Sequence, residues 1–368
     1  MDKVNWKQVG LYLGLVFGLS WLLDLAIALT VGYGRPEATL LLQAQMLLPA
    51  GCAIALEMYV FKGNILHQVR AKRGKPRIFY LFFAAYALAF VVLGVVASIV
   101  QTDSMTAIAT AITQALTVLG LLLLIVLRIA SGRESFSQAW LGGGKWRQWL
   151  AWGLGVALFY VLQTLLNWLF GLGEAVDVVR WMTESLPAEA QTMSPGTFLI
   201  VSAVQSVVMG SFLGLLIGFG EEYGWRGYLQ RELVKLGKVK GIVLLGVIWG
   251  VWHAPAIWLG HNYAGYPVLG TGLMVAYSTG LAFVLGYVVL KTGSVLLASF
   301  LHALNNQVYA YLTTMVYKPA DPVFSFGVGI YGLLTLGVVV LFLLRDPIWR
   351  QDQERANTAV LEGSLSEA

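Results

Sequence analysis

The feature that most constrains this chain is a succession of ten apolar runs, each about 18–25 residues long. Inside a bilayer no water satisfies the backbone, so a chain crosses it as helices or as a closed barrel. Runs of this length are typical of helices, because a membrane strand needs only about ten residues. Only 12% of the residues are charged, about half the share of a soluble domain. We therefore predict an all-α, polytopic membrane helix bundle with about ten transmembrane helices.

The expected spans fit the length of a bilayer crossing, and their boundaries follow the apolar runs. They cover residues 8–32, 38–61, 78–100, 105–127, 148–170, 197–220, 241–260, 270–290, 294–316 and 326–344. The first run is too long for the core of a signal peptide and lacks a cleavage pattern, so we expect a retained span. The single cysteine, Cys52, excludes an internal disulfide and is expected to be a small buried side chain.

The loops between the runs carry opposite charges and so predict an orientation. Basic residues gather in loops 62–77, 128–147 and 226–240, whereas loop 171–196 is mainly acidic. With both termini in the cytoplasm, 21 of the 24 Lys and Arg residues lie on the cytoplasmic side or its membrane edge, the three exceptions being Arg35, Arg180 and Lys318. Cytoplasmic loops of membrane proteins are rich in basic residues. The net charge of +5 therefore reflects topology, and we expect no nucleic-acid partner.

Three short polar motifs fall inside or beside the spans of the C-terminal half. They are Glu221-Glu222-x-x-x-Arg226, Trp249-x-x-x-His253 and His302-x-x-x-Asn306. Residues four apart share one face of a helix, so each motif pairs its first and last members, and Glu221 points about 100° away from the Glu222–Arg226 face. Ionisable groups at membrane depth usually mark a site.

The plainer interpretation is an ion pair that ends a spanning helix and two histidines that bond neighbouring helices. Two intramembrane histidines together with paired carboxylates favour a functional site instead. The helical rise places Glu221, His253 and His302 about 21, 18 and 14 Å from the cytoplasmic ends of their segments, in one layer. This layer requires the sixth run to begin after Thr197 or to bend near Gly210.

Other polar and small residues predict packing rather than chemistry. Pro255 removes a backbone hydrogen bond and predicts a break just after His253. The pairs Gly210/Gly214 and Gly246/Gly250 predict close helix contacts. Four polar residues of the first two spans are expected to form structural hydrogen bonds, with no partner evident from the sequence: Asp24, Gln43, Gln45 and Glu57.

In this order, the three motifs resemble those of the CAAX prenyl protease type 2 and bacteriocin-processing (CPBP, Abi-like) family of intramembrane proteases. The resemblance covers residues 200–310, and its one departure is Trp249, where phenylalanine is usual. It implies hydrolysis of a peptide bond within or beside the membrane. Eukaryotic relatives act on a prenylated C-terminal CAAX tail, and some bacterial members act as immunity or scaffold proteins.

The resemblance divides the chain into three expected parts. Residues 1–195 form an N-terminal membrane region with about five spans and cytoplasmic basic loops, 196–346 form the catalytic membrane core, and 347–368 form a polar tail. We expect a multi-pass protein of the plasma membrane with its active site toward the cytoplasmic side. Its expected partners are membrane lipid and a membrane-embedded or lipidated peptide substrate.

Amide hydrolysis needs an activated water and a group that stabilises the oxyanion. Glu221 is the expected base, with His253 helping to hold the water. Glu222, held by Arg226, would orient the site, although the opposite assignment of the two glutamates is open. His302 and Asn306 would donate hydrogen bonds to the oxyanion.

A metal alternative uses Glu221, His253 and His302, because two histidines and a glutamate bind zinc in many hydrolases. The absence of a His-Glu-x-x-His motif and the presence of Asn306, a poor zinc ligand, favour metal-free activation of water. One divalent zinc ion stays an alternative. Two other functions also stay open, namely a non-catalytic immunity or scaffold protein and a transporter of small solutes or ions.

Overall fold

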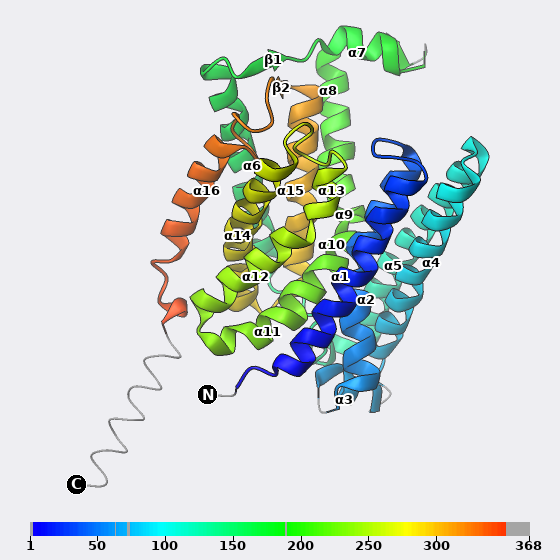
Figure 1. The fold of residues 1–368 in the computed structure, drawn as a ribbon, viewed down its shortest axis with the longest axis vertical. Coiled ribbons are helices and arrows are strands. Elements are labelled where there is room, and N and C mark those ends of the chain that lie inside the picture. Colours follow the sequence, from blue (N-terminus) through cyan, green and yellow to red (C-terminus); the bar gives the residue numbers. More distant parts are fainter. Residues whose placement is uncertain (1–2, 63, 72–73, 188–189, 351–368) are drawn as a thin grey trace.

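A computed structural model describes residues 3–62, 64–71, 74–187 and 190–350 of the chain as an upright bundle of helices (Figure 1). The helices are α1 (Trp6–Leu29), α2 (Pro36–Ala55), α3 (Ile65–Ala71), α4 (Pro76–Val100), α5 (Asp103–Gln138), α6 (Trp146–Leu169), α7 (Val178–Ser185), α8 (Pro195–Ala203), α9 (Gly210–Leu213), α10 (Leu215–Glu222), α11 (Gln230–Leu233), α12 (Lys238–Trp252), α13 (Ala254–Trp258), α14 (Pro267–Thr292), α15 (Val295–Met315) and α16 (Ile330–Leu343). The strands β1 (Gly173–Ala175) and β2 (Tyr317–Pro319) pair antiparallel, with Glu174 opposite Lys318.

Local sequence explains where these helices begin. Proline stands in the first turn of α2, α4, α8 and α14, where its fixed φ suits the helix and its missing N–H leaves no bond unmade. Side-chain hydroxyls cap the start of two other helices. The Thr102 hydroxyl accepts a hydrogen bond from the backbone N–H of Met105 in α5, and the Ser294 hydroxyl accepts one from the backbone N–H of Leu297 in α15. The chain is therefore divided into helices by its own turn residues.

The helices identify a polytopic helical membrane protein. Within the described residues, seven helical segments are long and apolar enough to cross a membrane, namely Trp6–Leu29, Pro36–Val60, Pro76–Val100, Asp103–Gln138, Trp146–Leu169, Pro195–Leu213 and Pro267–Thr292. The other three expected spans correspond to α12 with α13, to α15 and to α16. The all-α polytopic fold is confirmed, whereas the count of ten spans stays a prediction.

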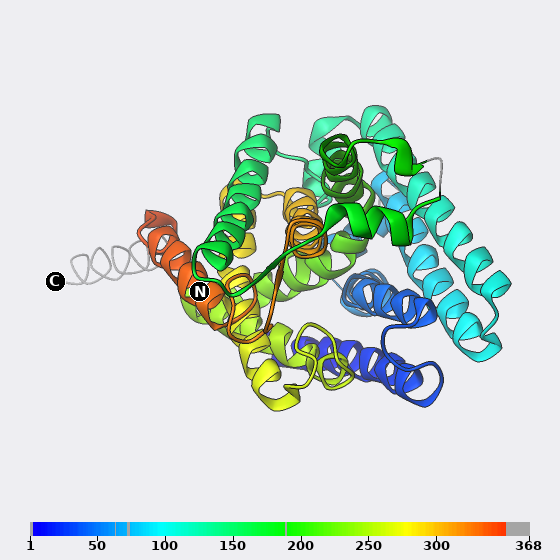
Figure 2. The same ribbon diagram turned by 90° about the horizontal axis from the view of Figure 1, so that it is seen from above.

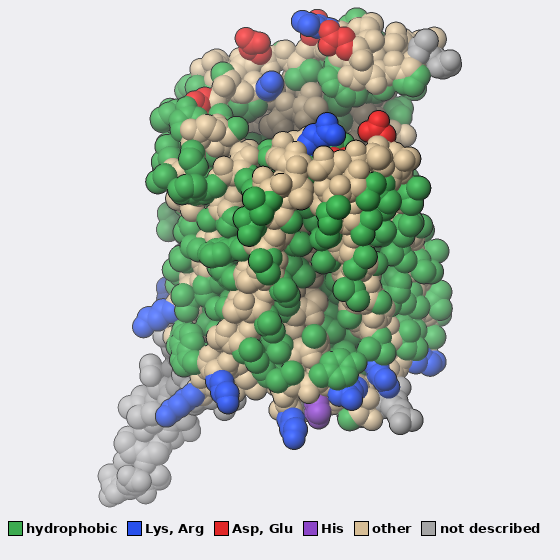
Figure 3. All heavy atoms as spheres, turned by 45° about the vertical axis from the view of Figure 1, so that its right-hand side comes forward, with side chains coloured by type: hydrophobic (Ala, Val, Ile, Leu, Met, Phe, Trp, Pro, Cys, Tyr) green, Lys and Arg blue, Asp and Glu red, His purple; other side chains and the backbone are tan. Residues whose placement is uncertain are grey.

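The two ends of the bundle differ in charge. Helix α1 begins and α16 ends at one end, which we call the basic end, and α7, β1 and β2 lie at the other, which we call the α7 end (Figure 1). On the face drawn in Figure 3, Lys and Arg side chains gather at the basic end, while Asp and Glu side chains occur toward the α7 end. This division agrees with the loop charges, and the orientation in a membrane stays a prediction. Seen from above, the helices surround α10 and α15 (Figure 2).

Helix α10 lies in close contact with both α2 and α15, because glycines replace larger side chains at the contacts. A Cβ atom at Gly218 would lie 2.5 Å from the carbonyl oxygen of Ser299, and one at Gly220 would lie 2.5 Å from that of Met46. Such distances leave no room for a side chain. Glycine therefore lets the backbone of α10 approach both neighbours.

The pair Gly246/Gly250 does the same between α12 and α14, where a Cβ at either position would collide with the backbone of Thr279 or Val275. The predicted close contact is confirmed there. At Gly210 and Gly214 an added Cβ would lie 3.3 Å from Gln307 and 3.2 Å from Ala303, which is also tight.

The expected irregularities of two helices are present. Between Pro195 and Leu236 the helical path contains π-helical turns at Val204–Met209 and Tyr223–Leu229 and a break at Gly214. The helical path is therefore irregular on both sides of Gly210, where a bend was one of the two expected ways to form a common layer. The helix is interrupted at His253 itself, which separates α12 from α13, one position before the break that Pro255 predicts.

Three of the four polar residues in the first spans have partners. The amide of Gln45 donates to Asp24 at 3.0 Å. The carboxylate of Glu57 accepts from Arg231 and from the Tyr223 hydroxyl, each at 2.7 Å. Their structural role is confirmed, whereas Gln43 has no side-chain hydrogen bond within the described residues. Cys52 is buried and free.

The glycine contacts predict a stability difference between two similar substitutions. Gly246→Ala places a Cβ against Thr279 and should lower the free energy of unfolding by about 1–3 kcal/mol through overpacking. Gly272→Ala, on α14 with no atom within 4 Å of the new Cβ, should be neutral or stabilising by up to about 1 kcal/mol. Thermal unfolding in detergent, followed by circular dichroism, measures both. Equal melting temperatures for the two variants would contradict the close contact.

Candidate functional site

The three polar motifs converge on one cavity of about 440 Å³ inside the bundle. Glu221 reaches it from α10, Trp249 and His253 from the end of α12, and His302 and Asn306 from one face of α15. The structure thus brings together five of the seven residues singled out in the sequence. The other two, Glu222 and Arg226, lie behind the cavity wall and are fully buried.

Glu222 is the centre of a buried charged network. Its Oε1 accepts a hydrogen bond from Arg226 at 2.9 Å and another from Nδ1 of His302 at 2.8 Å. Because Nδ1 points toward this carboxylate, Nε2 of His302 points away from it and lies 3.9 Å from Oε1 of Glu221. The network links α10 to α15.

Trp249 contacts both parts of the Glu-Glu-x-x-x-Arg motif. Its indole N–H donates to Oε2 of Glu221 at 2.6 Å, and the guanidinium carbon of Arg226 lies 4.1 Å from the centre of its ring. A hydrogen bond to a carboxylate and a cation over an aromatic face are both favourable where water is excluded. The indole therefore fixes one oxygen of Glu221 and leaves Oε1 facing His302.

His253 is oriented by the helix end on which it lies. Its Nδ1 is 2.8 Å from the backbone carbonyl of Trp249, an acceptor, so Nδ1 carries the proton. Nε2 is then the ring's acceptor, and the side chain lines the cavity. The break before Pro255 is what allows an imidazole to occupy this position at the end of α12.

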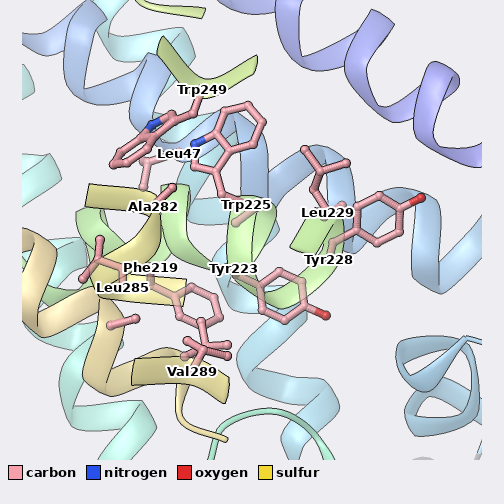
Figure 4. Close-up of a cluster of buried hydrophobic side chains, with 14 of the residues drawn as sticks. Leu47, Phe219, Tyr223, Trp225, Tyr228, Leu229, Trp249, Ala282, Leu285 and Val289 are labelled. Atoms are coloured by element: carbon pink, nitrogen blue, oxygen red, sulfur yellow. The ribbon is translucent and has the colours of Figure 1, made fainter. Parts of the chain in front are cut away.

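The back of the site is apolar. Figure 4 shows Phe219, Tyr223 and Trp225 of the α10 region packed together with Trp249 of α12. Phe219, Tyr223 and Trp225 are fully buried. This packing excludes water from the side on which Glu222 and Arg226 lie, and ionic interactions are stronger in such surroundings.

Sequence reasoning missed a second polar cluster on the cavity wall. Oδ1 of Asn305 accepts from the hydroxyls of Tyr160 at 2.8 Å and Tyr277 at 3.2 Å, and the two hydroxyls are 2.6 Å apart. The amide of Asn305 also donates to Oδ1 of Asn306 at 3.1 Å, which leaves the Asn306 amide as a donor. The adjacency of Asn305 and Asn306 was the one available signal, because Tyr160 and Tyr277 belong to no motif.

The zinc alternative stays a prediction that the described residues do not test. Among the described residues, no group of three or more His, Cys, Asp or Glu side chains is placed to hold a metal ion. Glu221 and His302 bond Trp249 and Glu222 through one atom each, and Nδ1 of His253 bonds a carbonyl. Oε1 of Glu221 and Nε2 of each histidine are left free by these bonds.

Comparison with known proteins agrees with the motifs. Residues 203–308, which contain all three, match the family model described as type II CAAX prenyl endopeptidase Rce1-like. A curated CAAX prenyl protease 2 of Methanococcus maripaludis is 40% identical over 53 residues, and the match spans 14% of this chain and 20% of that relative. No solved structure matches the chain.

The fold and the site therefore define a polytopic membrane protein with the features of an intramembrane peptidase family. Residues 203–308 form a domain of the Rce1-like type II CAAX prenyl endopeptidases, and the resemblance seen in the motifs is confirmed.

The buried pair predicts a large effect on stability. Arg226→Met removes one of the two donors to Glu222 and leaves His302 as the other. The partly unpaired carboxylate in an apolar interior should cost about 3–5 kcal/mol of unfolding free energy. The matched control is Arg180→Met, because Arg180 pairs with Glu184 at the same spacing but with side chains 74% and 61% exposed. That change should leave the melting temperature nearly unchanged, because exposed ion pairs contribute little to stability. Thermal unfolding in detergent compares them, and similar shifts would argue against a buried network.

Proposed function

We propose that this protein is an intramembrane endopeptidase that hydrolyses a peptide bond of a membrane-embedded or lipidated, CAAX-type substrate by activated water. The observation that carries the proposal is the placement of Glu221. One of its oxygens is fixed by Trp249, and the other faces Nε2 of His302 across 3.9 Å at the wall of a cavity. This distance is too long for a direct hydrogen bond, so Oε1 is free to accept from a water in the cavity.

In the proposed reaction Glu221 is the general base. Oε1 takes one proton from the water while the water oxygen forms a bond to the carbonyl carbon. Nε2 of His253 accepts a hydrogen bond from the other O–H, which stays intact, and so orients the water. Glu221 then returns the proton to the amine nitrogen as the C–N bond breaks. General acid–base catalysis of this kind contributes about 10²–10⁴-fold to a rate.

The oxyanion would be stabilised by His302 and Asn306. Since Nδ1 of His302 donates to Glu222, the proposed role requires the imidazolium form, in which Nε2 can donate to the oxyanion from the same side as the Asn306 amide. The cluster of Glu221, Glu222, Arg226 and His302 then carries two negative and two positive charges. Glu222 does not line the cavity, and its Oε1 already accepts from both Arg226 and His302, which supports Glu221, not Glu222, as the base.

We further propose that α12 with α13, α15 and α16 join the seven longer segments as spans. The chain would then cross a plasma membrane ten times with both termini in the cytoplasm. His302 follows Val295 by seven residues, about 10 Å along α15, which supports a catalytic layer in the cytoplasmic half. Residues 1–195, 196–346 and 347–368 are proposed as N-terminal region, catalytic core and tail, of which 351–368 lie outside the described residues.

Loss of the base or of either histidine should abolish proteolysis. Glu221→Gln, His253→Ala and His302→Ala should each lower kcat by about 10²–10⁴-fold. Glu184→Gln, at an exposed glutamate of α7, should keep full activity. The assay uses purified protein in liposomes and two quenched peptides, a farnesylated CAAX tail and a plain transmembrane segment, with and without a chelator.

The outcomes of this assay separate the alternatives. Loss of cleavage in the wild type on adding chelator would contradict metal-free activation of water. Cleavage that survives Glu221→Gln would contradict the assignment of the base. Folded wild-type protein that cleaves neither peptide would favour the non-catalytic or transport function.

The hydrogen bond from Trp249 predicts a smaller, specific effect. Trp249→Phe keeps an aromatic face for Arg226 but removes the donor to Glu221, and hydrogen bonds to charged groups contribute about 1.5–3 kcal/mol. We expect kcat to fall about tenfold or more with KM unchanged. The control is Trp168→Phe on α6, where the side chain is 66% exposed. An unchanged kcat in Trp249→Phe would mean that the indole N–H has no part in catalysis.

A further inference from the structure

Part of the cavity wall comes from α2, which lies outside the region that matches the family model. Gln45 is the polar residue of this part, beside Leu42 and Met46. The backbone of α2 touches α10 here, because a Cβ atom at Gly220 would lie 2.5 Å from the Met46 carbonyl oxygen. Gly220 directly precedes Glu221, so Gln45 lies in the same cavity as the proposed base and next to the helix that carries it.

The hydrogen bond between Gln45 and Asp24 fixes which end of the Gln45 amide faces the cavity. Nε2 of Gln45 donates to Oδ2 of Asp24 at 3.0 Å, and Asp24 is 2% exposed. An ionised carboxylate only accepts hydrogen bonds, so it holds the NH2 end of the amide. Oε1 of Gln45 has no hydrogen-bond partner among the described residues, yet it is not one of the enclosed polar atoms that lack a partner. That oxygen is therefore accessible from the cavity.

Helix α1 holds the cavity wall in a second place. The indole N–H of Trp252, another lining residue, donates to the Ser20 hydroxyl at 2.8 Å, and the indole N–H of Trp21 donates to the Trp252 carbonyl at 3.2 Å. Ser20 and Asp24 are four apart, so one face of α1 bonds both wall residues. Side chains that already have fixed partners lose little freedom when a ligand binds. Helix α1 therefore prepares this wall for a ligand.

A bond that served only to join α1 to α2 would be expected to satisfy both of its side chains, because buried polar groups are almost always hydrogen-bonded. The pair does not do so. Oδ1 of Asp24 is enclosed without a partner among the described residues, and Oε1 of Gln45 is unbonded as well. The arrangement is explained if the Gln45 oxygen receives its partner from a molecule that enters the cavity.

This partner must be a hydrogen-bond donor, because Oε1 is an acceptor. An extended peptide has a main-chain N–H at every residue except proline, and each of these needs an acceptor once it leaves water. A neutral amide oxygen in a largely apolar wall suits such a neutral donor. The main chain of a peptide is thus the donor that a peptidase cavity would supply.

From these contacts, and resting on the proposed function, we infer that Gln45 is a substrate-binding residue. Its Oε1 accepts a hydrogen bond from a main-chain N–H of the peptide near the scissile bond. Asp24 is the positioning residue that keeps this oxygen directed into the cavity. The contact is made in the bound substrate and in the transition state alike, so its loss should raise KM and leave kcat unchanged. Proline is excluded at the one substrate position that supplies this N–H.

Kinetics with a double variant test this role. Asp24→Leu with Gln45→Met replaces both partners with apolar side chains of similar size, so neither is left unbonded in the interior. The matched control is Gln43→Met, because Gln43 is half-buried, two residues away on α2 and outside the cavity lining. The assay uses the two quenched peptides in liposomes, together with analogues that are N-methylated at one main-chain nitrogen at a time.

We expect the double variant to raise KM by about three- to tenfold with kcat unchanged, which is the effect of losing one hydrogen bond. Methylation at one nitrogen should lower kcat/KM of the wild type by a similar factor and have no such effect in the double variant. Asp24→Asn, which allows the Gln45 amide to turn over, should give an intermediate KM. Gln43→Met should behave as the wild type.

Equal KM values for the wild type and the double variant would overturn the inference, as would a fall in kcat alone, which a merely structural pair would cause. Binding of the uncleaved peptides to Glu221→Gln protein, with and without the two changes, gives the same comparison through Kd. Wild-type protein that binds the peptides but cleaves neither would contradict the proposed function, while the ratio of Kd values still decides the role of Gln45. Absence of binding in both backgrounds would overturn both.

Discussion

The structure depends on the need to pair charges inside a membrane protein. Glu222 and Arg226 are fully buried, and neither could be held there alone, because an unpaired ion in an apolar interior is strongly destabilising. His302 bonds the same carboxylate oxygen from α15. The pairing therefore fixes how far α10 and α15 are rotated and shifted relative to each other, and the position of Glu221 at the cavity follows from that arrangement.

This arrangement is possible only because the backbones approach closely. Gly218 and Gly220 place α10 against α15 on one side and α2 on the other. As a result the N-terminal half contributes directly to the candidate site, with Gln45 and Met46 on the cavity wall. The family domain at residues 203–308 is thus embedded in helices that the family model does not include.

Much of the site was predictable because helical spacing is a local property. The four-residue spacing correctly paired Glu222 with Arg226 and placed His302 and Asn306 on one face, and Pro255 correctly marked the helix break. The partners of Asp24 and Glu57 and the cluster around Asn305 were not predictable, because they depend on contacts between helices distant in sequence. Which glutamate faces the cavity was open for a similar reason, since it depends on the rotation of α10 between its neighbours.

The composition of the cavity wall also has a consequence for turnover. Hydrolysis would create a new carboxylate on one fragment, and of the described residues that line the cavity none is Lys or Arg. Glu221 would repel that new negative charge, whereas the imidazolium of His302, which the proposed oxyanion role requires, would attract it. Release of the acidic fragment should therefore depend on the charge of His302.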